Sequence, residues 1–278
     1  MQQALSDAAI VRIIQNQRTQ LDRNLPEWAR RSNPIVRRHL GTYWKTIAPD
    51  VTQMFRWLWL QVGFIVLSFF FPALLTLIMP AVTVSLVLLP IAAVMYVQAL
   101  FGVGALSAES VVSEKRNGTL DTLRATPRPL QHILLSKMAA AVWRQVEDLN
   151  IILLAVTLLS LPVLVIQYGL LFSAVDNPYV VGLTTIFGLC TVVFRVLIEP
   201  VMVSAIGILM GTVNPNRVTA VGSTALLAVG YFIVINLPRL MQIGWEGRIL
   251  LEMVVPVALP LLIIVGCLRL SAYLLARD

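Results

Sequence analysis

The sequence predicts an all-α polytopic membrane protein with six transmembrane helices. The chain has 278 residues, of which 58% are hydrophobic and 13% charged, whereas soluble domains are about 45–50% apolar and about 25% charged. Its mean hydropathy is +0.83. Apolar runs alternate with short polar segments, and the first two exceed the roughly 20 residues that a bilayer requires. We also expect an amphipathic interfacial helix before the first span and a short cytoplasmic helix between the second and the third.

Residues 1–55 are predicted to form a cytoplasmic tail and the amphipathic helix. Apolar residues recur at helical spacing within 1–31, which fits a short amphipathic helix and a frayed tail equally well. Asn33 can cap the next helix, and Pro34 suits its first turn. Over residues 33–48 one helix face is apolar and another is basic. The apolar face contains Val36, Leu40, Tyr43, Trp44 and Ile47, and the basic face contains Arg37, Arg38 and Lys45. This pattern indicates an interfacial helix, with Trp44 at headgroup depth.

The predicted transmembrane domain, residues 56–278, holds the six spans. They are expected at 56–79, 82–106, 149–166, 180–210, 218–237 and 253–275. Pro72 is expected to kink the first span. Such a kink is tolerated in a membrane helix because packing against neighbouring helices can compensate for the lost backbone hydrogen bond. The fourth run contains Pro200, and it is either one kinked span or a span plus a helix at the surface. A mixed outer loop, 238–252, precedes the sixth span.

The basic residues predict the orientation of the chain. Residues 1–56 carry nine Lys and Arg and residues 107–147 carry six, whereas the loop 167–179 carries none. The positive-inside rule therefore places both termini and the central polar segment in the cytoplasm. Because the bases flank apolar runs, they indicate topology and anionic membrane lipid rather than nucleic acid as a partner.

The longest polar interruption covers residues 109–137, between the second and third spans. Gly118 allows a sharp change of direction at the end of a helix. Leu120 and Leu123 lie one helical turn apart, so a short helix there would show one apolar stripe. Pro127 would stop this helix. We therefore expect a short helix across the membrane face, with its apolar stripe free for a partner.

Few charged residues lie inside or beside the apolar runs. Arg195 and Glu199 are four residues apart, so they share a helix face and can pair. An intramembrane charge is a functional candidate by default; the alternative is a structural ion pair near an interface. Lys137 and Arg144 lie on a segment whose one face is apolar, and their side chains are expected to snorkel towards the headgroups.

Two further features have a plain structural interpretation. His39 and His132 stand alone in interfacial segments, and each is expected to be a surface histidine. Gly207 and Gly211 form a G-x-x-x-G motif, which permits close helix packing but is weak evidence of a dimer face.

The sequence predicts no catalytic residue and no metal site on this chain. It contains no G-x-x-x-x-G-K-[ST] phosphate loop, no H-E-x-x-H motif and no paired Cys and His cluster. Cys190 and Cys267 lie in separate apolar runs, which argues against a disulfide. We therefore expect a protein that is not itself an enzyme and holds no cofactor.

The central segment resembles that of the permease subunits of the ABC type-2 exporter family. In those permeases a glutamate-basic pair, a Gly-Thr-Leu-acid-x-Leu stretch and Thr-Pro follow the second span. The corresponding residues here are Glu114, Lys115 and Arg116, then Gly118, Thr119, Leu120, Asp121, Thr122 and Leu123, then Thr126 and Pro127. Asp121 stands where the family more often has Glu, and His39 where an acid is frequent. Asn33-Pro34 and the short turn before the fifth span also look like the family pattern.

The resemblance implies a type V exporter-like transmembrane subunit in a prokaryotic cytoplasmic (inner) membrane. It implies a second permease chain, the same or related, and two separate ABC ATPase subunits that bind ATP and Mg. Residues 118–127 would be the coupling helix that meets the ATPase, with Glu114 and Arg116 beside it. Helix 33–48 would be the interfacial connecting helix, and 238–252 the outer re-entrant region.

Two other interpretations stay open from the sequence. A non-transport membrane scaffold that anchors a larger complex would keep the spans without an ATPase, and the polar first 30 residues would suit a docking arm. A membrane enzyme would require acid, base or metal groups that converge at one depth, and the charged residues of this sequence are scattered.

Overall fold

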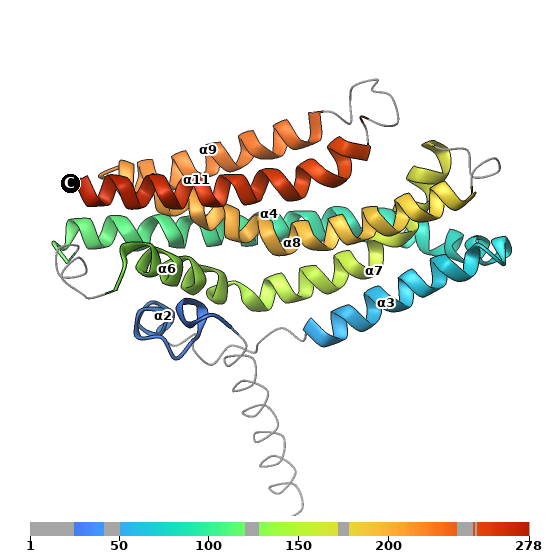
Figure 1. Cartoon of the computed structure of the whole chain (residues 1–278), viewed down its shortest axis with the longest axis horizontal. Helices are drawn as coiled ribbons and strands as arrows, with labels where there is room; N and C mark the ends of the chain where they lie inside the picture. Colours follow the sequence, from blue (N-terminus) through green and yellow to red (C-terminus); the bar gives the residue numbers. More distant parts are fainter. Residues whose placement is uncertain are drawn as a thin grey trace, which may run out of the picture.

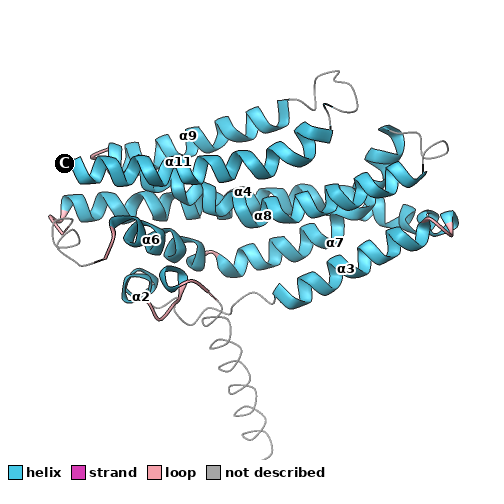
Figure 2. Cartoon of the chain, viewed as in Figure 1, coloured by secondary structure: helices cyan, strands magenta, loops and turns pink. Residues whose placement is uncertain are grey.

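The part of the chain that the structure describes is helical. The computed structural model describes residues 25–41, 51–119, 128–171, 178–237, 247 and 249–277, and within these ranges there is no strand (Figure 2). The predicted all-α class is therefore confirmed for this part of the protein.

Five helices in the described ranges are long and apolar enough to cross a membrane. They are α4 (Met79–Arg116), α7 (Val146–Leu171), α8 (Pro178–Val213), α9 (Arg217–Asn236) and α11 (Val255–Arg277), the last continuing a π-helical turn, η5 (Leu250–Val254). They lie roughly side by side along the long axis of the molecule (Figure 1). The predicted spans from the second to the sixth each correspond to one of these helices.

The predicted first span differs from its expected form. Helix α3 (Val51–Ser68) ends before Pro72, and a separate 3-10 helix, η3 (Pro72–Ile78), leads into α4. Because a proline disfavours helical backbone in the residue before it, the chain breaks here instead of kinking within one helix. Helix α3 also carries Arg56 and Gln61 and is not among the five membrane-length helices. The six-span count therefore stays a prediction.

Helices α4 and α8 form the centre of the bundle. They contain 38 and 36 residues, which corresponds to about 57 and 54 Å at a rise of 1.5 Å per residue. Both exceed the roughly 30 Å hydrocarbon thickness, so their ends project beyond it. Pro200 lies inside α8 without interrupting it, so the fourth apolar run is one continuous helix rather than a span plus a surface helix.

The G-x-x-x-G motif of α8 packs against α4 of the same chain. A Cβ added at Gly207 would lie 2.6 Å from the carbonyl oxygen of Gly104, and one at Gly211 would lie 2.6 Å from that of Ala108. The hydroxyls of Ser107 and Ser204 meet across the same contact at 2.7 Å. The close helix packing that the motif permits is therefore confirmed, and it occurs between two helices of the same chain.

Helix α2 (Pro34–Leu40) lies on α6 (Leu130–Arg144) at one end of the bundle, on the left in Figure 1. We call this the α2 end; α4, α8 and α11 finish there and α9 begins there. Val36 and Leu40 are fully buried, and they pack against Ala139, Ala140 and Trp143. The apolar face of the predicted interfacial helix is thus covered by α6 rather than by lipid; Trp44 lies outside the described residues.

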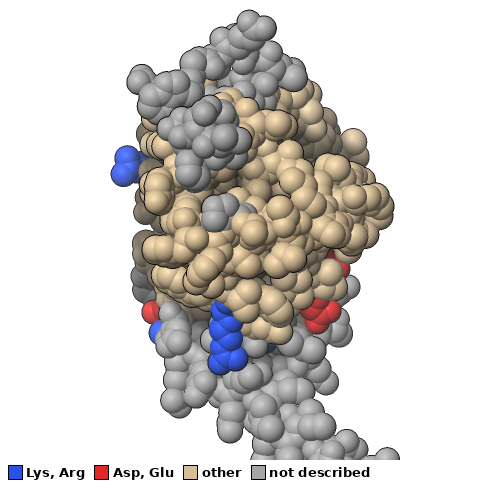
Figure 3. Space-filling model, turned by 90° about the vertical axis from the view of Figure 1, so that its right-hand side faces the viewer, with Lys and Arg blue, Asp and Glu red and all other residues tan. Residues whose placement is uncertain are grey.

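At the opposite end of the bundle, the residues that the structure describes carry little charge. Seen end-on, its described surface is almost entirely made of uncharged residues, with a few charged side chains at the margins (Figure 3). The orientation in which the α2 end faces the cytoplasm stays a prediction from the distribution of basic residues.

Replacing a glycine of the α4–α8 contact should weaken the bundle. We expect Gly207→Ala and Gly211→Ala to lower stability by about 1–3 kcal/mol, because the added methyl meets backbone that cannot rotate away. The matched control is Gly266→Ala, where an added Cβ has nothing within 4 Å. Thermal unfolding in detergent measures all three; equal midpoints for Gly207→Ala and Gly266→Ala would contradict this packing.

Candidate functional site

Helix α4 ends in a complete C-terminal cap at the α2 end. The Gly118 N–H donates to the Lys115 carbonyl at 3.3 Å, and the Thr119 N–H donates to the Glu114 carbonyl at 3.1 Å. These two hydrogen bonds define a Schellman motif, in which the residue at position 118 must adopt the left-handed backbone conformation. Its φ is +64°, so the predicted sharp turn at this glycine is confirmed. The cap fixes the direction in which the chain leaves α4 towards residues 120–127.

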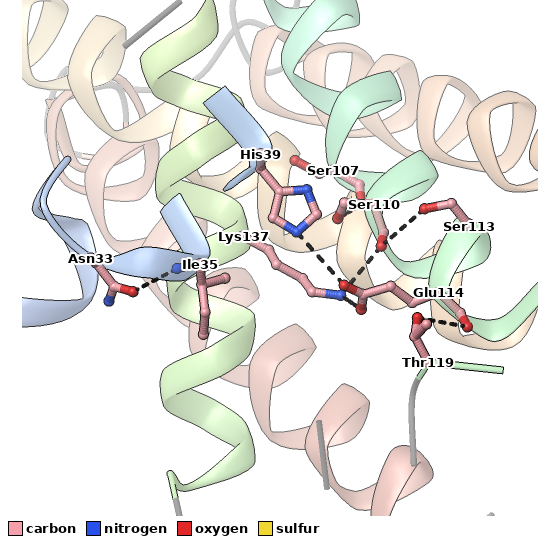
Figure 4. Close-up of polar contacts among 9 residues, drawn as sticks. All are labelled: Asn33, Ile35, His39, Ser107, Ser110, Ser113, Glu114, Thr119 and Lys137. Carbon is pink, nitrogen blue, oxygen red and sulfur yellow. Dashed lines mark hydrogen bonds and ion pairs between the residues drawn. The ribbon is translucent and has the colours of Figure 1, made fainter. Parts of the chain in front are cut away.

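A buried ion pair joins the end of α4 to α6. The Lys137 ammonium donates to the Glu114 carboxylate, and the two side chains are only 3% and 8% exposed. The same ammonium donates to the Ser110 carbonyl at 3.3 Å. His39 of α2 places its Nε2 3.7 Å from Glu114, so three helices meet at one carboxylate (Figure 4). We call Glu114, Lys137 and His39 the α2–α4–α6 cluster.

The protonation of His39 follows from its surroundings. Burial lowers its pKa to about 4, and the positive charges of Lys137, Arg38 and Arg144 act in the same direction. The contact with Glu114 would favour an imidazolium, but burial and three cations outweigh one carboxylate at 3.7 Å. His39 is therefore neutral at physiological pH.

Lys137 is also shifted from its ordinary pKa. Burial lowers the pKa of its ammonium to about 7, and Arg38 acts in the same direction. The touching carboxylate of Glu114 opposes this shift because it stabilises the charged amine. A buried lysine with one acidic partner depends on that partner, so neither residue can be lost alone without cost.

Asn33 caps α2 and also links it to α6. Its Oδ1 accepts from the Ile35 N–H at 3.0 Å, as expected for a capping residue. Its Nδ2 donates to the Ser136 hydroxyl of α6 at 3.2 Å. Pro34 occupies the first turn of α2, and Arg37 and Arg38 are exposed away from its buried face. The predicted cap is confirmed, and the apolar and basic faces are confirmed as far as Leu40. The predicted helix 33–48 differs in extent, because α2 ends at Leu40 and Gly41 takes a left-handed φ of +54°. Residues 42–48 lie outside the described residues.

The residues assigned to ATPase coupling divide into three groups. Glu114 points inward into the α2–α4–α6 cluster, whereas Arg116 and Gly118 are exposed and Thr119 is half-buried. The others, Leu120, Asp121, Leu123, Thr126 and Pro127, lie outside the described residues. The end of α4 and the start of α6, which flank this segment in the chain, both lie at the α2 end (Figure 1).

Two sequence-based predictions about this cluster were wrong. Lys137 was expected to snorkel and His39 to lie on the surface, but Lys137 is buried and His39 faces Glu114. Helix α6 meets no lipid along this face, because Leu134 and Met138 pack into a core with α4, α8 and α11. Helical spacing showed which face of α6 is apolar, and it could not show that other helices cover that face.

A second polar cluster lies near the middle of α8. The predicted pair is confirmed: Arg195 Nε donates to Glu199 Oε1 at 2.8 Å. Two tyrosines that the sequence did not single out complete it; Tyr96 of α4 donates to Oε2 at 2.7 Å and Tyr231 of α9 donates to Oε1 at 3.2 Å. Glu199 is only 1% exposed. The carboxylate therefore joins α4, α8 and α9 within the apolar bundle.

No group of His, Cys, Asp and Glu suited to a metal ion occurs among the described residues.

No family model, curated protein or solved structure matches this chain.

The ion pair between Glu114 and Lys137 makes a direct prediction about stability. Lys137→Met alone should lower the free energy of unfolding by about 3–5 kcal/mol, because it leaves Glu114 buried without a cation. Glu114→Leu combined with Lys137→Met should recover most of this loss, since both charges then disappear together. Denaturation of the three proteins in detergent measures the coupling; a double variant as unstable as the sum of the two single variants would contradict the pairing.

The neutral state of His39 predicts how stability depends on pH. Its pKa is about 6.5 when unfolded and about 4 when folded, so its contribution is complete above pH 6.5 and is lost as pH falls through 4. The contribution is on the order of 3 kcal/mol. The difference in stability between wild type and His39→Gln, measured from pH 7 to 4, isolates this histidine from the carboxylates. A difference that stays constant over this range would show that His39 keeps one charge state.

Proposed function

We propose that this chain is the transmembrane permease subunit of an ATP-driven ABC exporter. It would couple ATP hydrolysis on a separate ATPase subunit to export across a prokaryotic cytoplasmic membrane. A second permease chain would complete the transmembrane part, and six spans would leave both termini in the cytoplasm. ATP and Mg would bind only to the partner, and this chain would contribute no catalytic residue.

The observation that supports this role most strongly is the α2–α4–α6 cluster. The segment 118–127, assigned as the coupling helix, begins with Gly118 and Thr119 in the cap of α4 and precedes α6 in the chain. The buried pair between Glu114 and Lys137 ties the last turn of α4 to the middle of α6. A displacement of the end of α4 would therefore also move α6.

The bundle also offers a route by which such a displacement would spread. Helix α4 is held against α8 through the glycine contact, and Glu199 links both of them to α9. Closely packed helices transmit displacement as rigid bodies because packed interfaces do not deform continuously. ATP binding by the partner would shift the chain between two arrangements only if the partner binds one of them more tightly.

Co-purification tests the proposed partner. The tagged chain, expressed in its native host and extracted in a mild detergent, should retain a nucleotide-binding subunit that hydrolyses ATP. Leu120→Asp and Leu123→Asp should each reduce recovery of that subunit, because an acid would replace the apolar surface that the partner covers. The companions are identified by mass, and ATP hydrolysis is assayed on the same sample.

Val218→Asp is the matched control for these variants. Val218 is 83% exposed at the α2 end and opens the first turn of α9, where an acid is favourable. This variant should retain the ATPase. Recovery of a stable complex without any nucleotide-binding subunit would contradict the exporter role and favour the membrane scaffold.

A further inference from the structure

A small cavity lies where α2, α4 and α6 meet, beside the α2–α4–α6 cluster. Its volume is about 30 Å³, and its polar lining residues are His39, Ser110, Lys137 and Arg144. About 10–15 Å³ is enough to hold one water molecule. The cavity therefore has room for one or two water molecules or for a single monatomic ion, and an anion of several heavy atoms, such as phosphate, is too large for it.

The side chains around this cavity favour a negative charge. Lys137 and Arg144 line it, whereas Glu114 does not. Burial lowers the pKa of His39 most, and three nearby cations lower it further; they are Lys137, Arg38 and Arg144. Burial and then Arg38 also lower the pKa of Lys137. Two groups from different helices thus lie where an added positive charge is disfavoured, and the same field attracts an anion.

Lys137 brings a hydrogen-bond donor to the cavity. Its ammonium carries three N–H groups. Among the described residues it donates to the Glu114 carboxylate and to the Ser110 carbonyl, which uses two of them. The side chain is only 3% exposed, so bulk water does not surround the third. Because a charged donor binds an anion more strongly than a neutral acceptor, an anionic occupant satisfies this N–H better than water does.

We propose that this cavity binds one chloride ion. The ion would accept the third N–H of Lys137 and would lie beside the guanidinium of Arg144, since both residues line the cavity. It would offset the positive charge where the three helices meet and would add a contact between α4 and α6 to the one that Glu114 makes. The site does not depend on ATP-driven transport.

Thermal unfolding of the purified full chain in detergent tests this site. Chloride replaces gluconate as the sodium salt at constant ionic strength, so that charge screening does not change. An ion that binds only the folded chain stabilises it increasingly as its concentration rises above the dissociation constant. We expect the unfolding midpoint to rise by several degrees in chloride. The same midpoint in chloride and in gluconate would overturn the site and leave water as the occupant.

Variants of the lining separate this cavity from other sites for chloride. Arg144→Gln should remove most of the rise, because it takes away one of the two lining cations, whereas Arg144→Lys should keep it. The matched control is Arg277→Gln, which removes the same charge from a residue outside the cavity and should show the full rise. An equal rise in wild type, Arg144→Gln and Arg277→Gln would show that chloride acts elsewhere and would overturn the site.

Chlorine nuclear magnetic resonance measures the binding without unfolding the protein. The chloride line broadens when the ion exchanges with a bound site, and we expect wild type and Arg277→Gln to broaden it equally. Ala141→Leu and Ser110→Val, made separately, fill the cavity and should each remove most of the broadening. No broadening by wild type, or full broadening by both cavity-filling variants, would overturn the chloride site.

Discussion

The pairing of Glu114 with Lys137 is the interaction on which the α2 end depends. A buried ammonium and a buried carboxylate are each costly alone, and they are tolerated because they satisfy one another. The pair fixes α6 against α4, and α6 in turn supplies the surface that buries Val36 and Leu40 of α2. His39 of α2 contacts the same carboxylate, with its Nε2 3.7 Å from Glu114. The helices on either side of residues 120–127 in the chain, α4 and α6, are thereby held in fixed relative positions.

The rest of the bundle is held by contacts of a different kind. The glycines of α8 bring its backbone against that of α4, and the carboxylate of Glu199 gathers hydroxyls from α4 and α9. Close backbone contact and hydrogen bonding supply the specificity that apolar burial cannot, because lipid competes equally for apolar side chains. Helices α4 and α9 pack through Ala108 and Ala220, both fully buried, and this contact lies between an apolar cavity and a second cavity at the α2 end.

Local features of the sequence predicted local features of the structure. Asn33 caps α2, Gly118 turns the chain at the end of α4, and Arg195 pairs with Glu199, because each depends on residues within five positions. The α2–α4–α6 cluster was not predictable in this way, since Glu114 and Lys137 are 23 positions apart. Periodicity shows which face of a helix is apolar, and it does not show whether lipid or protein covers that face. The same gap explains why Lys137 was expected at the headgroups.

The central claim is that residues 120–127 meet an ATPase while their flanks are locked by Glu114 and Lys137. A photoreactive amino acid placed at 120 or at 123 in living cells, with position 218 as the control, tests this contact most directly. The account predicts that 120 and 123 cross-link to a chain that binds ATP and that 218 does not. Cross-links from 120 and 123 only to lipid, or only to a chain without a nucleotide site, would contradict it.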